Sequence, residues 1–172
     1  MAGTAISDIM EATQLAKGGV YGNFENKDEI CLEVFNYLAK SLAKATDKSM
    51  EGETTAKGKL FALLNYYNDR LIKNNAGGCP ILNFGTEADD TNPVIKKRVN
   101  EAIDASQNRI ANVIKMGIEA GEFKETFDAD MFAVKMFTMI EGAVLVSRVK
   151  GNNKHMELIT GMLRGEIEQN GK

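Results

Sequence analysis

The stretch from Ala5 to Lys27 sets the tightest limit on how this chain can fold. Its apolar residues recur at helical spacing in two short segments, separated by Gln14-Leu15. This spacing predicts one helix over Ala5–Thr13 and a second over Lys17–Phe24. Two short helices around a tight turn form a helix-turn-helix, whose second helix enters the major groove of DNA.

Each predicted short helix has one apolar side. Ile6, Ile9 and Met10 share a face of the first helix, and Val20 and Phe24 share the inner side of the second. These faces need a partner layer to cover them, because a helix buries its apolar stripe only against another element.

Two ungapped runs in this stretch carry a family resemblance: residues 3–12, GTAISDIMEA, and residues 16–29, AKGGVYGNFENKDE. They resemble the TetR family of bacterial one-component regulators, and the Lys-Gly-x-x-Tyr-x-x-Phe-x-x-Lys pattern over 17–27 is the specific part. The remainder resembles the family in length, helical content and a Gly-Cys-Pro turn. The resemblance implies a homodimeric repressor with a variable ligand-binding domain behind its DNA-binding head.

The expected DNA contacts lie in and around the second short helix. Lys17 has the reach for DNA, and the Gly18 and Gly19 amides can approach a phosphate closely because glycine has no side chain. Asn23 is the candidate for a base edge, since its amide can pair with adenine. The resemblance further implies phosphate contacts for the following residues: Thr4, Tyr21 and Lys27. In the alternative reading, Tyr21 is an aromatic at the edge of the core and the two lysines are solvated charges.

The stretch also departs from the family pattern. Family members have a further helix before the position of Gly3, and that helix completes the core beneath the two short ones. We therefore expect an incomplete head in this 172-residue chain, which binds DNA weakly or not at all. Gln14 takes a turn position that glycine adopts more cheaply. Ala16 occupies the N-cap position of the second short helix, which we call the reading helix; Ser, Thr, Asp or Asn would supply a side-chain cap there.

The rest of the chain reads as helices. Asn26 with Glu29 three residues later marks a helix start. Further helices are expected over these ranges: from Asn26 to about Asp47, Thr55–Asn74, Ile81–Ala88, from Pro93 to about Ala120, Asp128–Val149 and Asn153–Glu168. The predicted fold is all-α, with an incomplete helix-turn-helix over residues 1–27 and a helical ligand-binding and dimerisation domain over 28–172.

The segment Asp128–Val149 is apolar on more than one face, so it needs cover on more than one side. A single small subunit supplies little such cover, which favours burial against a second copy. The resemblance implies that the last two helices pair with their copies as a four-helix bundle.

Charge and cysteine content limit the class of protein. A net charge of −3 and a pI near 5.3 argue against a broadly basic nucleic-acid-binding surface, but leave room for a local one. Two distant cysteines suit a reducing cytoplasm, and no signal peptide is visible. The most apolar segment carries Lys135, Glu141 and Arg148, so it is not a membrane span. We expect a cytoplasmic protein.

No catalytic, cofactor or metal pattern stands out, so an enzyme is not expected. His155 is the single histidine, and no Glu-x-x-His motif surrounds it. Cys79, in a Gly-Gly-Cys-Pro turn, is a candidate thiol sensor if it is partly exposed, although most such cysteines are structural.

A ligand cavity is implied by the resemblance rather than by residue spacing. Methionine and aromatic side chains adapt to varied ligands, so the candidate lining residues are Tyr66, Tyr67, Phe84, Met136, Met139 and Ile140. The alternative is that these side chains are ordinary core.

The resulting hypothesis is a ligand-responsive transcriptional repressor that binds a palindromic operator in double-stranded DNA. Its partners would be that operator, a small-molecule effector and a second copy of the chain. The alternative is a helical homodimer that binds a small molecule or a protein without touching DNA. The acidic balance and the glycines of the reading helix support that alternative.

Overall fold

The computed structural model describes the backbone of residues 4–73 and 77–172, and their side chains except those of 70–73. In this described part the chain forms helices joined by short turns. They are α1 (Ile6–Thr13), α2 (Lys17–Tyr21), α3 (Lys27–Met50), α4 (Ala56–Lys73), α5 (Pro80–Ala88), α6 (Pro93–Glu119), α7 (Ala129–Lys150) and α8 (Lys154–Gln169). The described residues contain no strand, only an isolated bridge between Phe123 and Gly171. The predicted all-α fold is confirmed.

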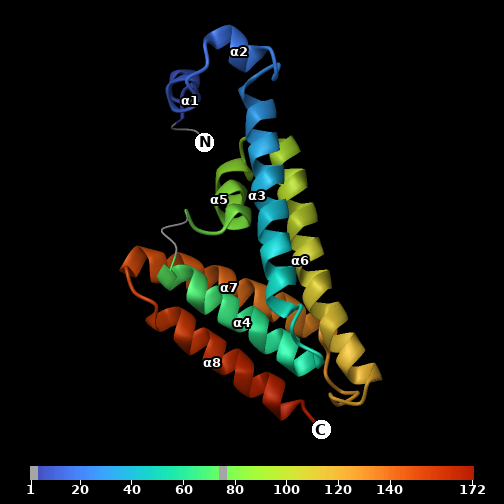
Figure 1. Cartoon of the computed structure of the whole chain (residues 1–172). Helices are drawn as coiled ribbons and strands as arrows, with labels where there is room; N and C mark the ends of the chain where they lie inside the picture. The colour runs from blue at the N-terminus through green and yellow to red at the C-terminus, as the bar shows by residue number, and fades with distance from the viewer. Residues whose placement is uncertain (1–3, 74–76) are drawn as a thin grey trace.

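The helices divide the molecule into a small head and a larger body (Figure 1). Helices α1 and α2 lie at one end, where α3 begins. The long helices α3 and α6 run side by side in the same direction, with α5 beside them. Helices α4, α7 and α8 cross the far end of α3 and α6. The rod α3 therefore connects the head directly to the body.

Side-chain caps fix the starts of three long helices. Asn26 accepts a hydrogen bond from the Glu29 N–H at 2.9 Å, as the sequence predicts. Asn92 does the same for Ile95 at 3.0 Å, with Pro93 in the first turn of α6. Asp128 caps α7 through the Met131 N–H at 3.0 Å. Each cap satisfies an N–H that has no partner within its helix.

Two helix ends differ from the prediction. Helix α2 ends at Tyr21 rather than Phe24, because Gly22 follows and the Asn23 side chain takes the Gly19 carbonyl at 2.9 Å. Helix α3 continues past Asp47 to Met50, whose buried side chain anchors the last turn in the core.

The apolar side chains along α3 are only partly buried. Phe35 and Leu42 lie in the core, whereas Val34 is 36% and Leu38 38% exposed. Cys31 is buried in their place, because α5 and α6 pack on the side of α3 that carries Cys31 and Phe35.

The head packs loosely compared with the body. No residue of α1 is buried, and Val20 is the buried residue of α2. Gln14 adopts the left-handed conformation expected at the turn, with φ of 57°. Ala16 supplies no side-chain cap to α2. The body, in contrast, has a continuous core with these fully buried side chains among its members: Leu60, Leu64, Ile114, Phe132, Met136 and Leu163. None of the described helices combines the length and apolar character that crossing a membrane requires.

Candidate nucleic-acid interface and ligand cavity

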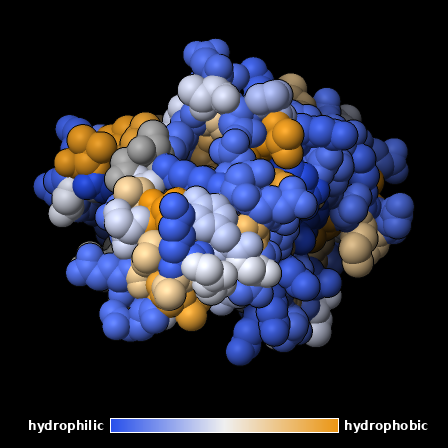
Figure 2. All heavy atoms as spheres, turned by 90° about the horizontal axis from the view of Figure 1, so that it is seen from above, coloured by the Kyte–Doolittle hydropathy of each residue, from blue (hydrophilic) through white to orange (hydrophobic). Residues whose placement is uncertain are grey.

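Two residues of the predicted DNA interface share one exposed face of α2. Lys17 and Tyr21 stand one helical turn apart, and the Lys17 Nζ lies 5.9 Å from the centre of the Tyr21 ring. Tyr21 is 40% exposed, so it is not simply a residue of the core. Viewed from the end that carries the head, the surface is mostly hydrophilic, with scattered apolar patches (Figure 2). This face of α2 therefore offers a cation and a phenol to the solvent.

The glycines of α2 have different surroundings. A Cβ at Gly18 would meet nothing within 4 Å, so the fold itself does not require glycine there. At Gly19, a Cβ would make ordinary contact with Leu15 at 3.6 Å. At Gly22, it would lie 3.0 Å from the Gly18 carbonyl oxygen. Close packing thus explains why residue 22 is glycine, whereas nothing in the described structure requires glycine at position 18.

Asn23 and Thr4 flank the exposed face in different ways. The Asn23 amide donates one N–H to the Gly19 carbonyl at 2.9 Å, so it closes the last turn of α2 and keeps its second N–H and its oxygen. Thr4 is half-buried just ahead of α1. Their predicted contacts with DNA stay predictions.

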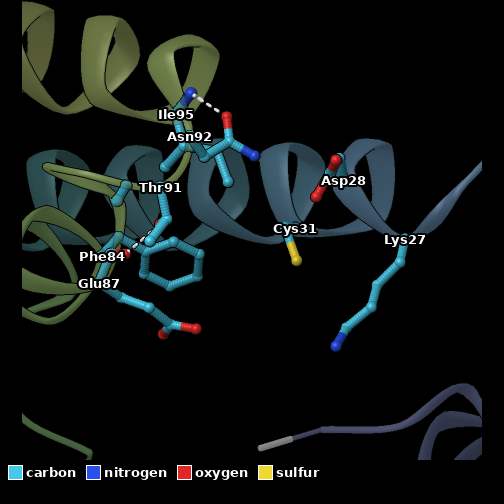
Figure 3. Close-up of a pocket in the computed structure, with 9 residues that line it drawn as sticks. Lys27, Asp28, Cys31, Phe84, Glu87, Thr91, Asn92 and Ile95 are labelled. Carbon is cyan, nitrogen blue, oxygen red and sulfur yellow. Dashed lines mark hydrogen bonds between the residues drawn. The ribbon is translucent and has the colours of Figure 1, made fainter. Parts of the chain in front are cut away.

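Lys27 lies at the start of α3, beside a cavity of about 270 Å³ between the first turns of α3, the end of α5 and the start of α6. We call this the Cys31 cavity; its lining residues are Lys27, Asp28, Cys31, Phe84, Glu87, Ala88, Thr91, Asn92 and Ile95. In Figure 3 the Lys27 amine, the Cys31 sulfur and the Glu87 carboxylate point to the same side. Burial raises the pKa of the Cys31 thiol above its ordinary value, and the nearby Lys27 charge opposes that shift.

A second, larger cavity of about 330 Å³ lies in the body between α3 and α6, with α4, α5 and α7 closing its inner side. We call it the α3–α6 cavity. Its inner wall is mostly apolar and includes Leu42, Leu63, Tyr67, Ile81, Ile110, Phe137 and Ile140. Its opening is lined by small residues of the two long helices: Ala39, Ala43, Ala102, Ala105 and Ser106. Small side chains leave the space that larger ones would fill.

Two side-chain pairs bridge α3 and α6 at the ends of that opening. At one end, the Arg98 guanidinium donates to the Asn36 Oδ1 at 3.0 and 3.2 Å, and Arg98 also pairs with Glu101 on its own helix. At the other end, eleven residues later on each helix, the Arg109 Nε lies 2.6 Å from the Asp47 Oδ1. We refer to these pairs as the two bridges. The opening between them is about 16 Å long at 1.5 Å per helical residue.

Three of the six predicted ligand-lining residues line one of the two cavities, and the other three do not. Tyr67 and Ile140 line the α3–α6 cavity, and Phe84 lines the Cys31 cavity. Tyr66, Met136 and Met139 are not among the described lining residues of either one. Met136 is fully buried, and Tyr66 and Met139 pack against the core. These three side chains therefore fit the alternative given above, in which they belong to the ordinary core.

Sequence reasoning missed the polar residues at the opening: Asn36, Lys40, Arg98 and Arg109. Methionine and aromatic side chains were the expected lining, whereas alanines line the opening of the cavity. A usable signal was present, because Ala39 and Ala43 recur one turn apart on α3, each followed by a lysine, and Ala102 and Ala105 lie between Arg98 and Arg109 on α6. That pattern alone does not reveal that the two helices lie side by side.

The expectation of a partly exposed thiol at Cys79 is wrong. Cys79 is only 4% exposed, and it precedes α5 inside the core cluster. Burial, followed by the nearby Glu141 carboxylate, raises the pKa of this thiol to about 12. A buried thiol with that pKa has almost no thiolate at neutral pH, which disfavours a sensor role.

The last two helices each leave an apolar stripe uncovered. On α7 it comprises Met131, Val134, Leu145 and Val149, and on α8 Leu158 and Met162; these side chains are 49% to 80% exposed. Gly142, Gly161 and Gly165 lie at the same helical phase, with open space where a Cβ would stand. The opposite side of α7, with Phe132, Met136 and Ile140, is buried in the core. We refer to the uncovered stripes together as the α7–α8 face.

In the part of the chain that the structure describes, no three His, Cys, Asp or Glu side chains come together as metal ligands.

The matching family model and two solved structures of similar sequence give the same family. Residues 56–163 match the family described as "Tetracyclin repressor-like, C-terminal domain". A TetR transcriptional regulator from Chloroflexus aurantiacus J-10-FL is 36% identical, covers 99% of this chain and 86% of its own, and superposes with a TM-score of 0.93. A TetR-family regulator from Cytophaga hutchinsonii is 31% identical with the same coverage and a TM-score of 0.90.

More distant curated relatives have related names. The HTH-type transcriptional repressor DhaR of Mycobacterium sp. strain GP1 is 22% identical over 155 residues, which are 90% of this chain and 77% of the repressor. The fatty acid metabolism regulator protein of Bacillus subtilis strain 168 is 23% identical over 141 residues, which are 81% of this chain and 70% of the regulator.

Proposed function

The chain belongs to the TetR family of transcriptional regulators, and from that premise we propose that it is a ligand-responsive repressor that binds a palindromic operator as a homodimer. Residues 1–27 would form the DNA-binding head and residues 28–172 the ligand-binding and dimerisation body. The relatives named as a repressor and as a regulator support the same role.

One observation carries the proposal: the rod that holds the head also forms one wall of the α3–α6 cavity. Helix α3 follows α2 directly in the chain (Figure 1). Its middle lines the cavity through residues such as Ala39, Leu42 and Ala43. A ligand between α3 and α6 would therefore act on the element that sets the position of the head.

The proposed mechanism is a shift between dimer geometries. In one geometry the two α2 helices fit successive major grooves, and in the other they do not. A ligand that occupies the α3–α6 cavity more tightly in the second geometry moves the population toward it, by no more than its difference in affinity for the two. The α7–α8 face would hold the two copies together in both.

A selection over random DNA duplexes tests the proposal. We expect enrichment of a symmetric site with two half-sites about one helical turn apart. Because no residue of α1 is buried, the selection is run with the chain as given and with a chain extended by a helix that covers the apolar side of α1. The extended chain is expected to bind more tightly. If neither enriches a symmetric site, the chain is a helical binding protein that does not touch DNA.

Variants then assign the contacts on the selected site. Lys17→Ala and Tyr21→Ala should each weaken DNA binding roughly tenfold, because each removes a contact to the phosphate backbone. Lys27→Ala is expected to act in the same direction. Lys44→Ala is the matched control, because Lys44 is an exposed lysine on α3 in the body. An equal loss in Lys44→Ala would indicate a general charge effect rather than the α2 face.

Gly18→Ala separates a DNA role from a folding role. The added methyl group meets open space in the protein, and alanine favours a helix over glycine by about 1 kcal/mol. The variant should therefore be at least as stable as the parent. If the Gly18 amide approaches a phosphate closely, the same variant binds the operator less tightly, and unchanged binding would remove Gly18 from the interface.

A further inference from the structure

The α3–α6 cavity has a charge pattern that the proposed function does not specify. Three cationic side chains line it, Lys40, Arg98 and Arg109, and no carboxylate occurs among its described lining residues. The rest of the described lining is apolar or small, apart from Asn36, Thr46, Tyr67 and Ser106. Arg98 pairs with Glu101 and Arg109 pairs with Asp47, so the unbalanced positive charge at the opening is that of Lys40, on a chain of net charge −3.

The polar groups beside the cations are already engaged. The Thr46 hydroxyl donates to the Leu42 and Ala43 carbonyls, and the Ser106 hydroxyl donates to the Ala102 carbonyl at 2.8 Å. These hydroxyls satisfy their own helices. The hydroxyls of Thr46 and Ser106 are therefore not the donors directed to a ligand.

The three cations differ in their partners. Arg98 and Arg109 form the two bridges, with Asn36 and Asp47 on α3. Lys40 is exposed and lies between Asn36 and Asp47 on the same helix, and the described residues supply no acceptor for its ammonium group. Because each guanidinium group already pairs with a carboxylate, Lys40 is the cation left to attract an anion, and a charge-assisted hydrogen bond is stronger than a neutral one.

We propose that the occupant of the α3–α6 cavity is a small amphipathic carboxylate, with its carboxylate held by Lys40 at the opening and its apolar body against the inner wall. The proposal rests on the proposed function only in naming this occupant the effector. The inner wall, with Leu63, Ile81 and Phe137, suits an apolar body of modest size, because the cavity of about 330 Å³ is at the small end of ligand sites.

The position of the carboxylate also suggests how the ligand acts on α3. An anion at Lys40 lies between the two bridges, where it competes with Asn36 and Asp47 for the guanidinium groups of α6. A guanidinium that turns to the ligand loosens the contact that holds α3 against α6. Binding of the ligand would thus change the angle between α3, which carries the head, and the body.

Calorimetric titration with matched probes tests the head-group requirement. The first set of probes, decanoate, decanol and decylamine, shares a flexible alkyl chain and differs in the head group. The second set, 2-naphthoate and 2-naphthol, shares a rigid aromatic ring system. At pH 7.5 and below micelle-forming concentrations, we expect each carboxylate to bind at least about tenfold more tightly than its alcohol, and decylamine to bind least. If neither carboxylate binds, or neither is preferred over its alcohol, the proposal is wrong.

The variant Lys40→Gln tests the assigned residue. It keeps a flexible polar side chain, one atom shorter than lysine, and removes the charge; because Lys40 is exposed, the thermal unfolding midpoint should match that of the parent. We expect about a tenfold loss of affinity for decanoate and less than about a twofold change for decanol. Lys44→Gln, one turn further along α3 and outside the described lining, should change neither. An equal loss of decanoate affinity in both variants would mean diffuse charge attraction and would overturn the assignment.

These outcomes are separable from those of the duplex selection, which contains no ligand. A chain that selects a symmetric DNA site and binds decanol as tightly as decanoate keeps the repressor function and loses the carboxylate effector. A chain that binds decanoate through Lys40 and selects no DNA site keeps the ligand assignment and loses the repressor function.

Discussion

The Glu122 carboxylate accepts a hydrogen bond from the backbone N–H of Ala56 at 3.1 Å, although 66 positions separate the two residues. Its second oxygen accepts from the Lys57 N–H at 3.2 Å. The loop after α6 thus adds a second N-terminal cap to α4, beside Thr55, whose hydroxyl accepts from the Gly58 N–H at 3.0 Å; the negative charge of Glu122 also faces the positive end of the helix dipole. This contact fixes the start of α4 to the far end of α6.

Removing this long-range cap should destabilise the body. We expect Glu122→Ala to lower the free energy of unfolding by about 1 kcal/mol, because two N–H groups lose their acceptor. Urea unfolding followed by circular dichroism measures the difference. The control is Glu119→Ala, an exposed glutamate in the last turn of α6 with no described partner. Equal stability of the two variants would contradict the role of Glu122.

A glycine at the same junction makes a second prediction. A Cβ on Gly117 would lie 2.5 Å from the Phe123 ring and 2.6 Å from the Ala56 Cβ, and both neighbours are buried. Neither can move without displacing the core, so Gly117→Ala should cost about 2 kcal/mol of unfolding free energy. Gly52→Ala is the matched control, because a Cβ there meets nothing within 4 Å. Equal urea midpoints for both variants would show that Phe123 and Ala56 can move to accommodate the added methyl group.

Local chemistry explains why so much of the fold could be predicted. The caps at Asn26, Asn92 and Asp128 are encoded within four residues of the helix starts, and the left-handed Gln14 follows from a two-residue turn. The cap of α4 by Glu122 could not be predicted in this way, because its partners come from distant parts of the chain.

The candidate site shows the same division. Lys17 and Tyr21 share a face because they stand one helical turn apart, so the sequence sufficed to pair them. The α3–α6 cavity depends on the side-by-side packing of two long helices, which no local pattern specifies. Met136 shows the error that follows when residue type alone is used to predict a cavity lining. Methionine suits a ligand pocket, but Met136 lies on the side of α7 that is buried in the core.

The Cys79 thiol predicts how stability depends on alkaline pH. Its pKa is raised from 9.0 to about 12 in the folded protein, first by burial and then by Glu141. Below pH 9 both folded and unfolded chains keep the thiol protonated. Between pH 9 and pH 12 the unfolded chain loses this proton while the folded chain keeps it, so the stabilising contribution of Cys79 falls as the pH rises.

Comparison of the parent with Cys79→Ala isolates that contribution. The difference in their free energies of unfolding should be constant up to about pH 8.5 and smaller by about 2 kcal/mol at pH 10.5. Cys31 is present in both proteins, so its titration cancels. Chemical unfolding at each pH provides the measurement. A difference that stays constant to pH 10.5 would mean that the folded thiol titrates normally.

The α7–α8 face predicts where two copies of the chain would meet in the proposed dimer. Leu145 on α7 is 51% exposed within a stripe that also contains open glycines, and such contiguous apolar surface marks an interaction site. Leu145→Glu places a charge in the centre of the proposed interface, where two copies bring two like charges together. We expect the parent to sediment as a dimer at micromolar concentration and Leu145→Glu to shift it toward the mass of one chain.

The matched control uses an exposed apolar residue outside that face. Tyr37 on α3 is 72% exposed, so Tyr37→Glu adds the same charge to the surface without entering the α7–α8 face. It should remain dimeric with an unchanged circular dichroism spectrum. Because the two α2 helices must reach successive grooves together, Leu145→Glu should also weaken operator binding at concentrations where Tyr37→Glu does not. Dissociation by Tyr37→Glu and not by Leu145→Glu would place the dimer interface on α3 instead.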